Sequence, residues 1–256
     1  MKIIENSDVI NGKIDHVNIG NEIEIICNNC PNLTKLPLWT RIERINCNGC
    51  DNLTELPLWP KIKDVECSYC PRLTKLPLWP NIETIHCTNC PGLIILPLWT
   101  NIINIDCSYC PYLIKLPLWP IIDMIYCWNC TRLTELSSWT TIKYISCHNC
   151  PNLTELPMWN TIESINCSDC QSLTKLPLWS TIKTIICNNC PNLTEIPLIN
   201  THKKRKYTNG NCIACSLENT YITKCNICVW SICKDCFINW HINRSENMCM
   251  HCGGNF

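Results

Sequence analysis

The sequence predicts an α/β-type solenoid with little helix, built from short parallel strands and followed by a small zinc-binding module. From Cys27 to Cys190, Cys-x-x-Cys pairs repeat every twenty residues. A fixed period of this length is typical of a solenoid, in which each unit buries its apolar face against its neighbours. After residue 200 the period ends, and four further cysteine pairs follow at the uneven spacing that is typical of metal sites.

The composition of the 256 residues argues against several functional classes. Lys and Arg number 21 and Asp and Glu number 21, so no overall charge favours nucleic acid or a membrane surface as partner. No stretch approaches eighteen consecutive apolar residues, which argues against a membrane span. Residues 1–11 lack the apolar core of a secretion signal, so the 26 cysteines are expected to be thiols and metal ligands. We expect a cytoplasmic protein, with the nucleus as the alternative.

The repeat unit combines a strand signal with an extended return path. Residues 1–20 are predicted to form an N-terminal cap, and nine repeats follow over 21–200. In one unit Ile85 and Cys87 alternate with polar neighbours, the period-two pattern of a half-buried strand. Proline in the Leu-Pro-Leu-Trp element excludes a helix interior, because proline lacks an N–H and clashes with the preceding turn. A representative unit reads Leu56-Pro57-Leu58-Trp59-Pro60-x-Ile62-x-x-Val65-x-Cys67-x-x-Cys70-Pro71-x-Leu73-Thr74.

This unit resembles a leucine-rich repeat, L-x-x-L-x-L-x-x-N/C-x-L followed by L-P. The resemblance covers about 70% of the chain and is closest to the twenty-residue type of bacterial effector repeats, with tryptophan in place of the second leucine of the L-P-x-L-P element. It implies an array of short parallel strands on a concave side and an extended or irregular convex side.

Two residue types are expected to fill the core of the array. Eight tryptophans recur at steps of twenty from Trp39 to Trp179, and we expect them to stack as a buried ladder. In each cysteine pair, the first residue is predicted to fill an inward strand position and the second a turn position, since free cysteine packs as a small hydrophobe. Metal knuckles or redox dithiols are the alternative, but no regular second set of ligands accompanies the pairs.

Two adjacent units depart from an otherwise small and polar strand surface. Large aromatic side chains exposed together are typical interface anchors, so we predict a partner-binding patch here. The alternative is that these side chains only cover neighbouring strands. Glu66, His86 and Asp106 lie in earlier units without a nucleophile pattern, and we expect them to form a solvated face. The residues of the predicted patch are Met124, Tyr126, Trp128, Tyr144 and His148.

The C-terminal part is predicted to bind zinc. Residues 201–211 are expected to form a basic linker, with a nuclear signal or an anion contact as alternatives. The four cysteine pairs of 212–256 can hold two tetrahedral zinc ions, and the closed thiolate sets indicate structural ions. A segment of this size cannot build a sufficient core alone, so the zinc ions are expected to supply its folding energy.

The run Ile232–Trp240 resembles the fifth and sixth ligands of an all-cysteine RING finger and the short helix after them. The resemblance implies a groove for an E2 ubiquitin-conjugating enzyme at Ile213 and Trp240. It also implies cross-brace ligation. One ion would be bound by Cys212, Cys215, Cys233 and Cys236, and the other by Cys225, Cys228, Cys249 and Cys252.

These resemblances predict a RING-type E3 ubiquitin ligase. In it the repeat array recruits a protein substrate and the zinc finger binds a ubiquitin-charged E2. A non-enzymatic protein-interaction scaffold with a structural zinc module is one alternative. A phosphoinositide-binding adaptor is another, because the cysteine spacing is also similar to that of a FYVE finger. That family needs a basic, histidine-containing run near its third ligand, whereas residues 222–228 hold one lysine and no histidine.

Overall fold

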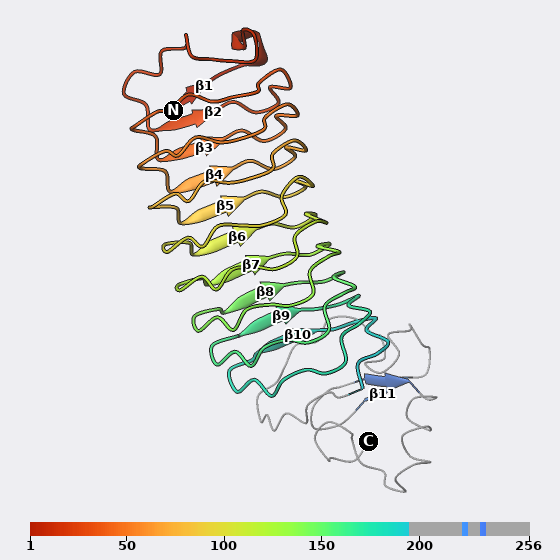
Figure 1. Ribbon diagram of the computed structural model, residues 1–256. Helices are drawn as coiled ribbons and strands as arrows, with labels where there is room; N and C mark the ends of the chain where they lie inside the picture. Colours follow the sequence, from red (N-terminus) through yellow and green to blue (C-terminus); the bar gives the residue numbers. More distant parts are fainter. Residues whose placement is uncertain (195–221, 225–230, 234–256) are drawn as a thin grey trace, which may run out of the picture.

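The computed structural model describes residues 1–194, 222–224 and 231–233. The first of these ranges forms a parallel β-solenoid whose ten strands lie side by side in chain order (Figure 1). The predicted solenoid with little helix is thereby confirmed, since the described residues contain one helix, the short 3-10 helix η1 at Asn6–Asp8. The strands are β1 (Lys2–Ile3), β2 (Glu24–Ile26), β3 (Arg44–Asn46), β4 (Asp64–Glu66), β5 (Thr84–His86), β6 (Asn104–Asp106), β7 (Met124–Tyr126), β8 (Tyr144–Ser146), β9 (Ser164–Asn166) and β10 (Thr184–Ile186).

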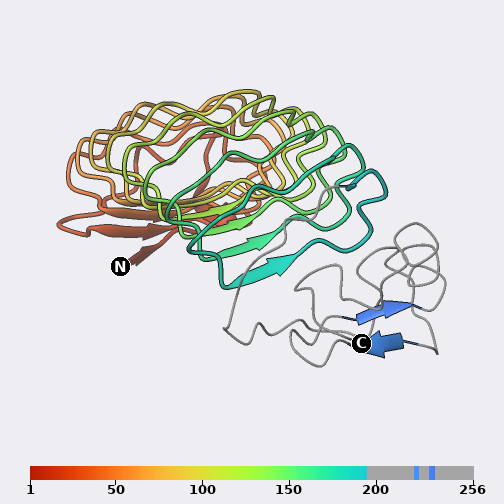
Figure 2. The same cartoon turned by 90° about the horizontal axis from the view of Figure 1, so that it is seen from below.

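Each turn of the solenoid repeats the same register. From β2 to β9 every strand residue pairs with the residue twenty positions later, as Ile85 does with Ile105. The strands occupy one side of the coil and the remaining segments return on the other side (Figure 2). Only the central residue of most strands is buried, because a three-residue strand with alternating side chains turns one inward and two outward.

The N-terminal segment adds a strand to the array instead of lying across it. Strand β1 pairs in parallel with β2, with Lys2 opposite Ile25. Ile4 and Ile14 are buried in the same core as the repeats. Ile4 and Ile14 therefore pack against the start of the repeat array.

A column of tryptophans runs through the core. Seven of them, from Trp59 to Trp179, are buried and stack with ring centroids 5.9–6.3 Å apart. Each indole N–H donates a hydrogen bond to a backbone carbonyl of the preceding turn, as Trp99 does to Pro77 at 2.9 Å. Tryptophan can be buried here because its polar N–H is satisfied. The prediction of eight buried rings was wrong for Trp39, which is only partly buried because the preceding segment supplies no tryptophan beneath it.

The repeat cysteines form a second column, as predicted. In all but the last described pair both cysteines are buried, and none of the eighteen is in a disulfide. The second thiol of a pair donates to the carbonyl of the first cysteine one turn earlier, as Cys90 does to Cys67 at 3.1 Å. Burial raises the pKa of the Cys70 thiol to about 12. The pairs therefore hold adjacent turns together through packing and sulfur hydrogen bonds.

The C-terminal predictions fall largely outside the described residues. Two strands, β11 (Ile222–Lys224) and β12 (Ser231–Cys233), pair antiparallel with Ile222 opposite Cys233. The linker 201–211 and most of the module 212–256 lie outside the described ranges.

Candidate functional site

The predicted patch is assembled on the strand face of two neighbouring turns. Met124 and Tyr126 come from β7, Tyr144 comes from β8, and Trp128 and His148 lie in the turns that follow these strands. The rings of Tyr126 and Tyr144 are 5.1 Å apart, and those of Trp128 and His148 are 4.8 Å apart and nearly parallel. All five side chains are half-buried. The structure therefore brings together every residue of the predicted patch.

Tyr109 extends the patch and was missed in the sequence. Its ring meets the edge of Trp128 with centroids 4.4 Å apart, and its side chain is exposed. It occupies a turn position where the backbone has φ 56°, in the left-handed region. Most turns place asparagine there, which tolerates that conformation. The sequence feature that could have indicated this residue is that Tyr69 and Tyr109 replace the usual asparagine at this repeat position.

The imidazole of His148 is held in place from two sides. Its Nδ1 lies 3.0 Å from the Oγ of Ser146 and 3.5 Å from the Nδ2 of Asn166. Burial lowers the pKa of His148, while Asp169 acts in the opposite direction. Burial also raises the pKa of Tyr144. The patch is therefore a set of uncharged rings at neutral pH, which suits contact with apolar or cationic groups.

Some small polar positions beside the patch are more buried than expected. Ser108, in the column of Trp128, is fully buried, and its hydroxyl has no hydrogen-bond partner among the described residues. Ser68 is 7% exposed and accepts a hydrogen bond from the backbone N–H of Thr88. These two serines serve the packing of the turns and do not form part of the accessible face.

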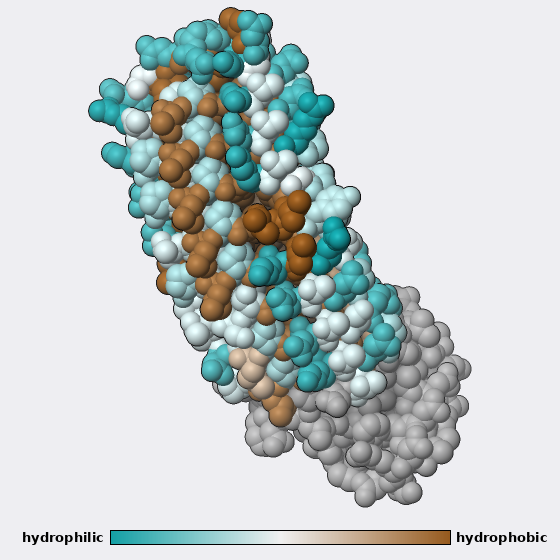
Figure 3. Space-filling view, viewed as in Figure 1, coloured by the Kyte–Doolittle hydropathy of each residue, from teal (hydrophilic) through white to brown (hydrophobic). Residues whose placement is uncertain are grey.

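The return side of the coil carries a second, apolar feature. A leucine or methionine at the same repeat position is 55–63% exposed in seven turns, and apolar side chains run in a row along the array in Figure 3. Ile94, Ile95 and Ile114 add exposed apolar surface in two neighbouring turns. The members of the row are Leu38, Leu58, Leu78, Leu98, Leu118, Met158 and Leu178.

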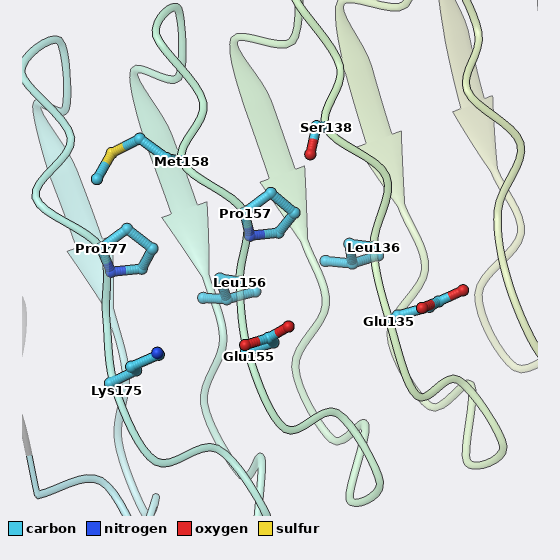
Figure 4. Close-up of a pocket in the computed structure, with 9 residues that line it drawn as sticks. All are labelled: Glu135, Leu136, Ser138, Glu155, Leu156, Pro157, Met158, Lys175 and Pro177. Carbon is cyan, nitrogen blue, oxygen red and sulfur yellow. The ribbon is translucent and has the colours of Figure 1, made fainter.

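The row is interrupted by Ser138, where a pocket of about 480 Å³ opens on the return side (Figure 4). Glu135, Glu155 and Lys175 line it together with Met158. The Ser137-Ser138 departure from the repeat was visible in the sequence, but its consequence was not predicted. Ser137 stands where most other units have proline, and its hydroxyl donates a hydrogen bond to the carbonyl of Leu116 at 2.7 Å.

The predicted zinc and E2-binding residues cannot be placed in the same way. Within the described residues, no group of three or more His, Cys, Asp or Glu side chains converges as a metal site. Cys233, one of the predicted ligands, ends strand β12. The other residues of these two predictions lie outside the described residues: the zinc ligands predicted at Cys212, Cys215, Cys225, Cys228, Cys236, Cys249 and Cys252, and the E2-binding residues predicted at Ile213 and Trp240.

The fold and the patch together define a repeat protein of the parallel β-solenoid class, with an aromatic surface on its strand face. Comparison with protein-family models and with curated proteins found no match to this chain. No helix within the described residues is long and apolar enough to cross a membrane.

Proposed function

We propose that this chain is a protein-binding solenoid that recruits a protein partner through the aromatic patch. The observation that carries this proposal is the cluster of half-buried rings on β7 and β8, in a sheet whose other strands present no tyrosine or tryptophan. Tryptophan and tyrosine dominate the energetics of protein interfaces. The stacked turns beneath the rings fix their positions before binding, so little conformational entropy is lost on association.

We further propose that the array is of the leucine-rich repeat type and serves a RING-type E3 ubiquitin ligase. Support for the ligase comes from the four C-terminal cysteine pairs, which suit two structural zinc ions. Strands β11 and β12 pair antiparallel, and in the sequence the pair Cys225 and Cys228 falls between them. The array would hold a substrate lysine near the E2 thioester, which raises the rate through proximity.

The non-enzymatic scaffold remains the competing proposal. Met250 and Gly253 stand where RING ligases usually carry a proline and a basic residue, which favours this alternative. Ubiquitin discharge by the zinc-loaded full chain, measured across a broad E2 panel, separates the two. Ubiquitin discharge with any E2 supports the ligase proposal. The absence of discharge with every E2 supports the scaffold proposal. Binding to phosphoinositide vesicles in place of discharge would instead support the lipid adaptor.

Recruitment is tested by capture of binding peptides selected from a random display library on the full chain. The double variant Tyr126→Ala/Trp128→Ala should lose the selected peptides. The matched control is Tyr112→Ala, which removes a tyrosine that is 50% exposed and lies outside the strands. Equal binding by the wild-type chain and the double variant would refute the patch as the recruitment surface.

A further inference from the structure

Two rows of charged residues cross the strand side of the array. In one of them, opposite charges pair with each other. This first row lies just before the strands. Its acidic and basic side chains alternate and pair between turns, as Lys143 does with Asp123 at 2.9 Å. Lys63 with Glu43 and Lys183 with Glu163 repeat the same arrangement. Such exposed pairs contribute little stability, but they leave little net charge.

The second row lies on the strands themselves and is acidic. Across β2–β10 the strand residues include four carboxylates, Glu24, Asp64, Glu66 and Asp106, against one guanidinium, Arg44. None of these four carboxylates forms an ion pair within the described part of the chain. The hydrogen bonds that these carboxylates accept come from neutral donors.

Two basic side chains lie near these carboxylates, Arg44 as the register partner of Asp64 and His86 between Glu66 and Asp106, but neither forms an ion pair with them within the described residues. Glu66 accepts hydrogen bonds from the side-chain amides of Asn46 at 2.6 Å and Asn48 at 3.1 Å. Asp106 accepts one from the backbone N–H of Ser108 at 3.0 Å. One carboxylate oxygen of Asp64 is buried without a described partner, and burial and the neighbouring Glu66 raise the pKa of this group. The strand face therefore carries surplus negative charge, although the whole chain is neutral.

The acidic row leads directly into the aromatic patch. Asp106 on β6 is the register partner of Tyr126 on β7, and adjacent strands lie about 4.8 Å apart. Glu66 on β4 lies in the same column two strands before Asp106. A cation placed over Tyr126 thus meets both the face of an aromatic ring and a carboxylate, and each attracts it.

From this arrangement we infer that the strand face from β4 to β8 binds a basic segment of a polypeptide partner. A lysine or arginine of that segment lies between Asp106 and Tyr126, and an apolar residue contacts Trp128. Glu66 and Asp106 are two strand spacings apart, roughly 10 Å. In a polyproline II conformation three residues advance about 9 Å and return the side chain to the same face. A second basic residue three positions away therefore reaches Glu66. This inference rests on the proposed recruitment function and specifies the chemistry of its partner.

Selection of a random peptide display library on the full chain tests the inference. Peptides lost on the Tyr126→Ala/Trp128→Ala variant should be enriched in Lys and Arg beside an apolar residue. Patch-dependent peptides without basic enrichment would overturn the inference and leave recruitment standing. If no peptide depends on the patch, the recruitment proposal itself fails.

A matched charge removal gives the second measurement, by fluorescence anisotropy with a selected peptide and its Lys/Arg→Gln counterpart. Asp106→Asn should weaken binding of the basic peptide about tenfold, the size of one charge-assisted hydrogen bond, and leave the Gln peptide unchanged. Asp51→Asn removes the same charge from an exposed turn position and should leave both affinities unchanged. An equal loss in the two variants would assign the effect to net charge and refute the site.

Discussion

The indole of Trp128 lies face to face with the imidazole of His148, with centroids 4.8 Å apart and planes inclined by 13°. The contact joins two turns of the solenoid through side chains on its surface. The imidazole is partly buried, and this burial lowers the pKa of His148. The centre of the proposed binding surface is thus also a titratable contact.

The stability of the solenoid should therefore depend on pH through His148. Its folded-state pKa lies below the unfolded value of about 6.5, so the unfolded chain binds more protons as pH falls through this range. The free energy of unfolding should decrease as pH falls from about 7.5 through 6.5. In His148→Gln this decrease should be smaller, as measured by urea denaturation at several pH values. His86→Gln, an exposed histidine on the same face, is the control; an equal change in both variants would contradict the assignment.

Asp64 should show the opposite pH dependence. Burial and Glu66 raise its pKa in the folded state, so its ionised form opposes folding at neutral pH. Asp64→Asn should raise the free energy of unfolding at pH 7, and this gain should shrink as pH falls towards the ordinary pKa of about 3.9. Denaturation curves of Asp64→Asn and Asp51→Asn between pH 4 and 7 measure the difference. A gain independent of pH would mean that charge is not its cause.

The tryptophan column should make a large contribution to stability. Trp99→Ala removes a fully buried ring and should cost about 3–5 kcal/mol. Trp99→Phe keeps most of the ring but loses the hydrogen bond to Pro77, and should cost about 1–2 kcal/mol. Trp39→Phe should cost less than Trp99→Phe, since Trp39 is only partly buried. Chemical denaturation of the three variants tests this order.

The repeat thiols should resist alkylation in the folded chain. Burial raises the pKa of Cys70 to about 12 and removes it from solvent, so it should not react with iodoacetamide at pH 8. Cys187 and Cys190 at the end of the described array are partly exposed and should react first. Peptide mapping by mass spectrometry follows each site. Rapid modification of Cys70 without unfolding would show that its turn opens locally.

The ligase proposal makes its own prediction for the C-terminal residues. Ile213→Ala removes no thiolate, so native mass spectrometry should still find two zinc ions while ubiquitin discharge falls. Cys233→Ser opens a zinc site and should lose a zinc ion together with discharge. Retained discharge in Ile213→Ala would place the E2 contact elsewhere.

The sequence predicted the solenoid because its period is a direct consequence of stacking. A residue such as Ile85 must recur every twenty positions if each turn is to contact the next one in the same register. The patch could be predicted for the same reason, since Tyr126 and Tyr144 occupy outward positions of adjacent strands. Tyr109 could not be placed by strand alternation, because it lies in a turn whose left-handed backbone redirects its side chain. The pocket at Ser138 forms where the leucine or methionine of the other turns is missing. The repeat pattern shows this substitution but not the cavity that results from it.

The uniform register also sets the distance between surface features in steps of one turn. Each turn advances the chain by one strand spacing, about 4.8 Å, so the patch on β7 and β8 lies roughly 10–15 Å from β10, the last strand of the described array. Removing residues 161–180 would join equivalent positions and shorten this interval by one step, because the contacts of the core link each residue to its equivalent in the next turn. The distance between a bound protein and the segment after β10 is thus a whole number of turns. Duplication of one repeat in the gene can lengthen this distance while every core contact keeps its register.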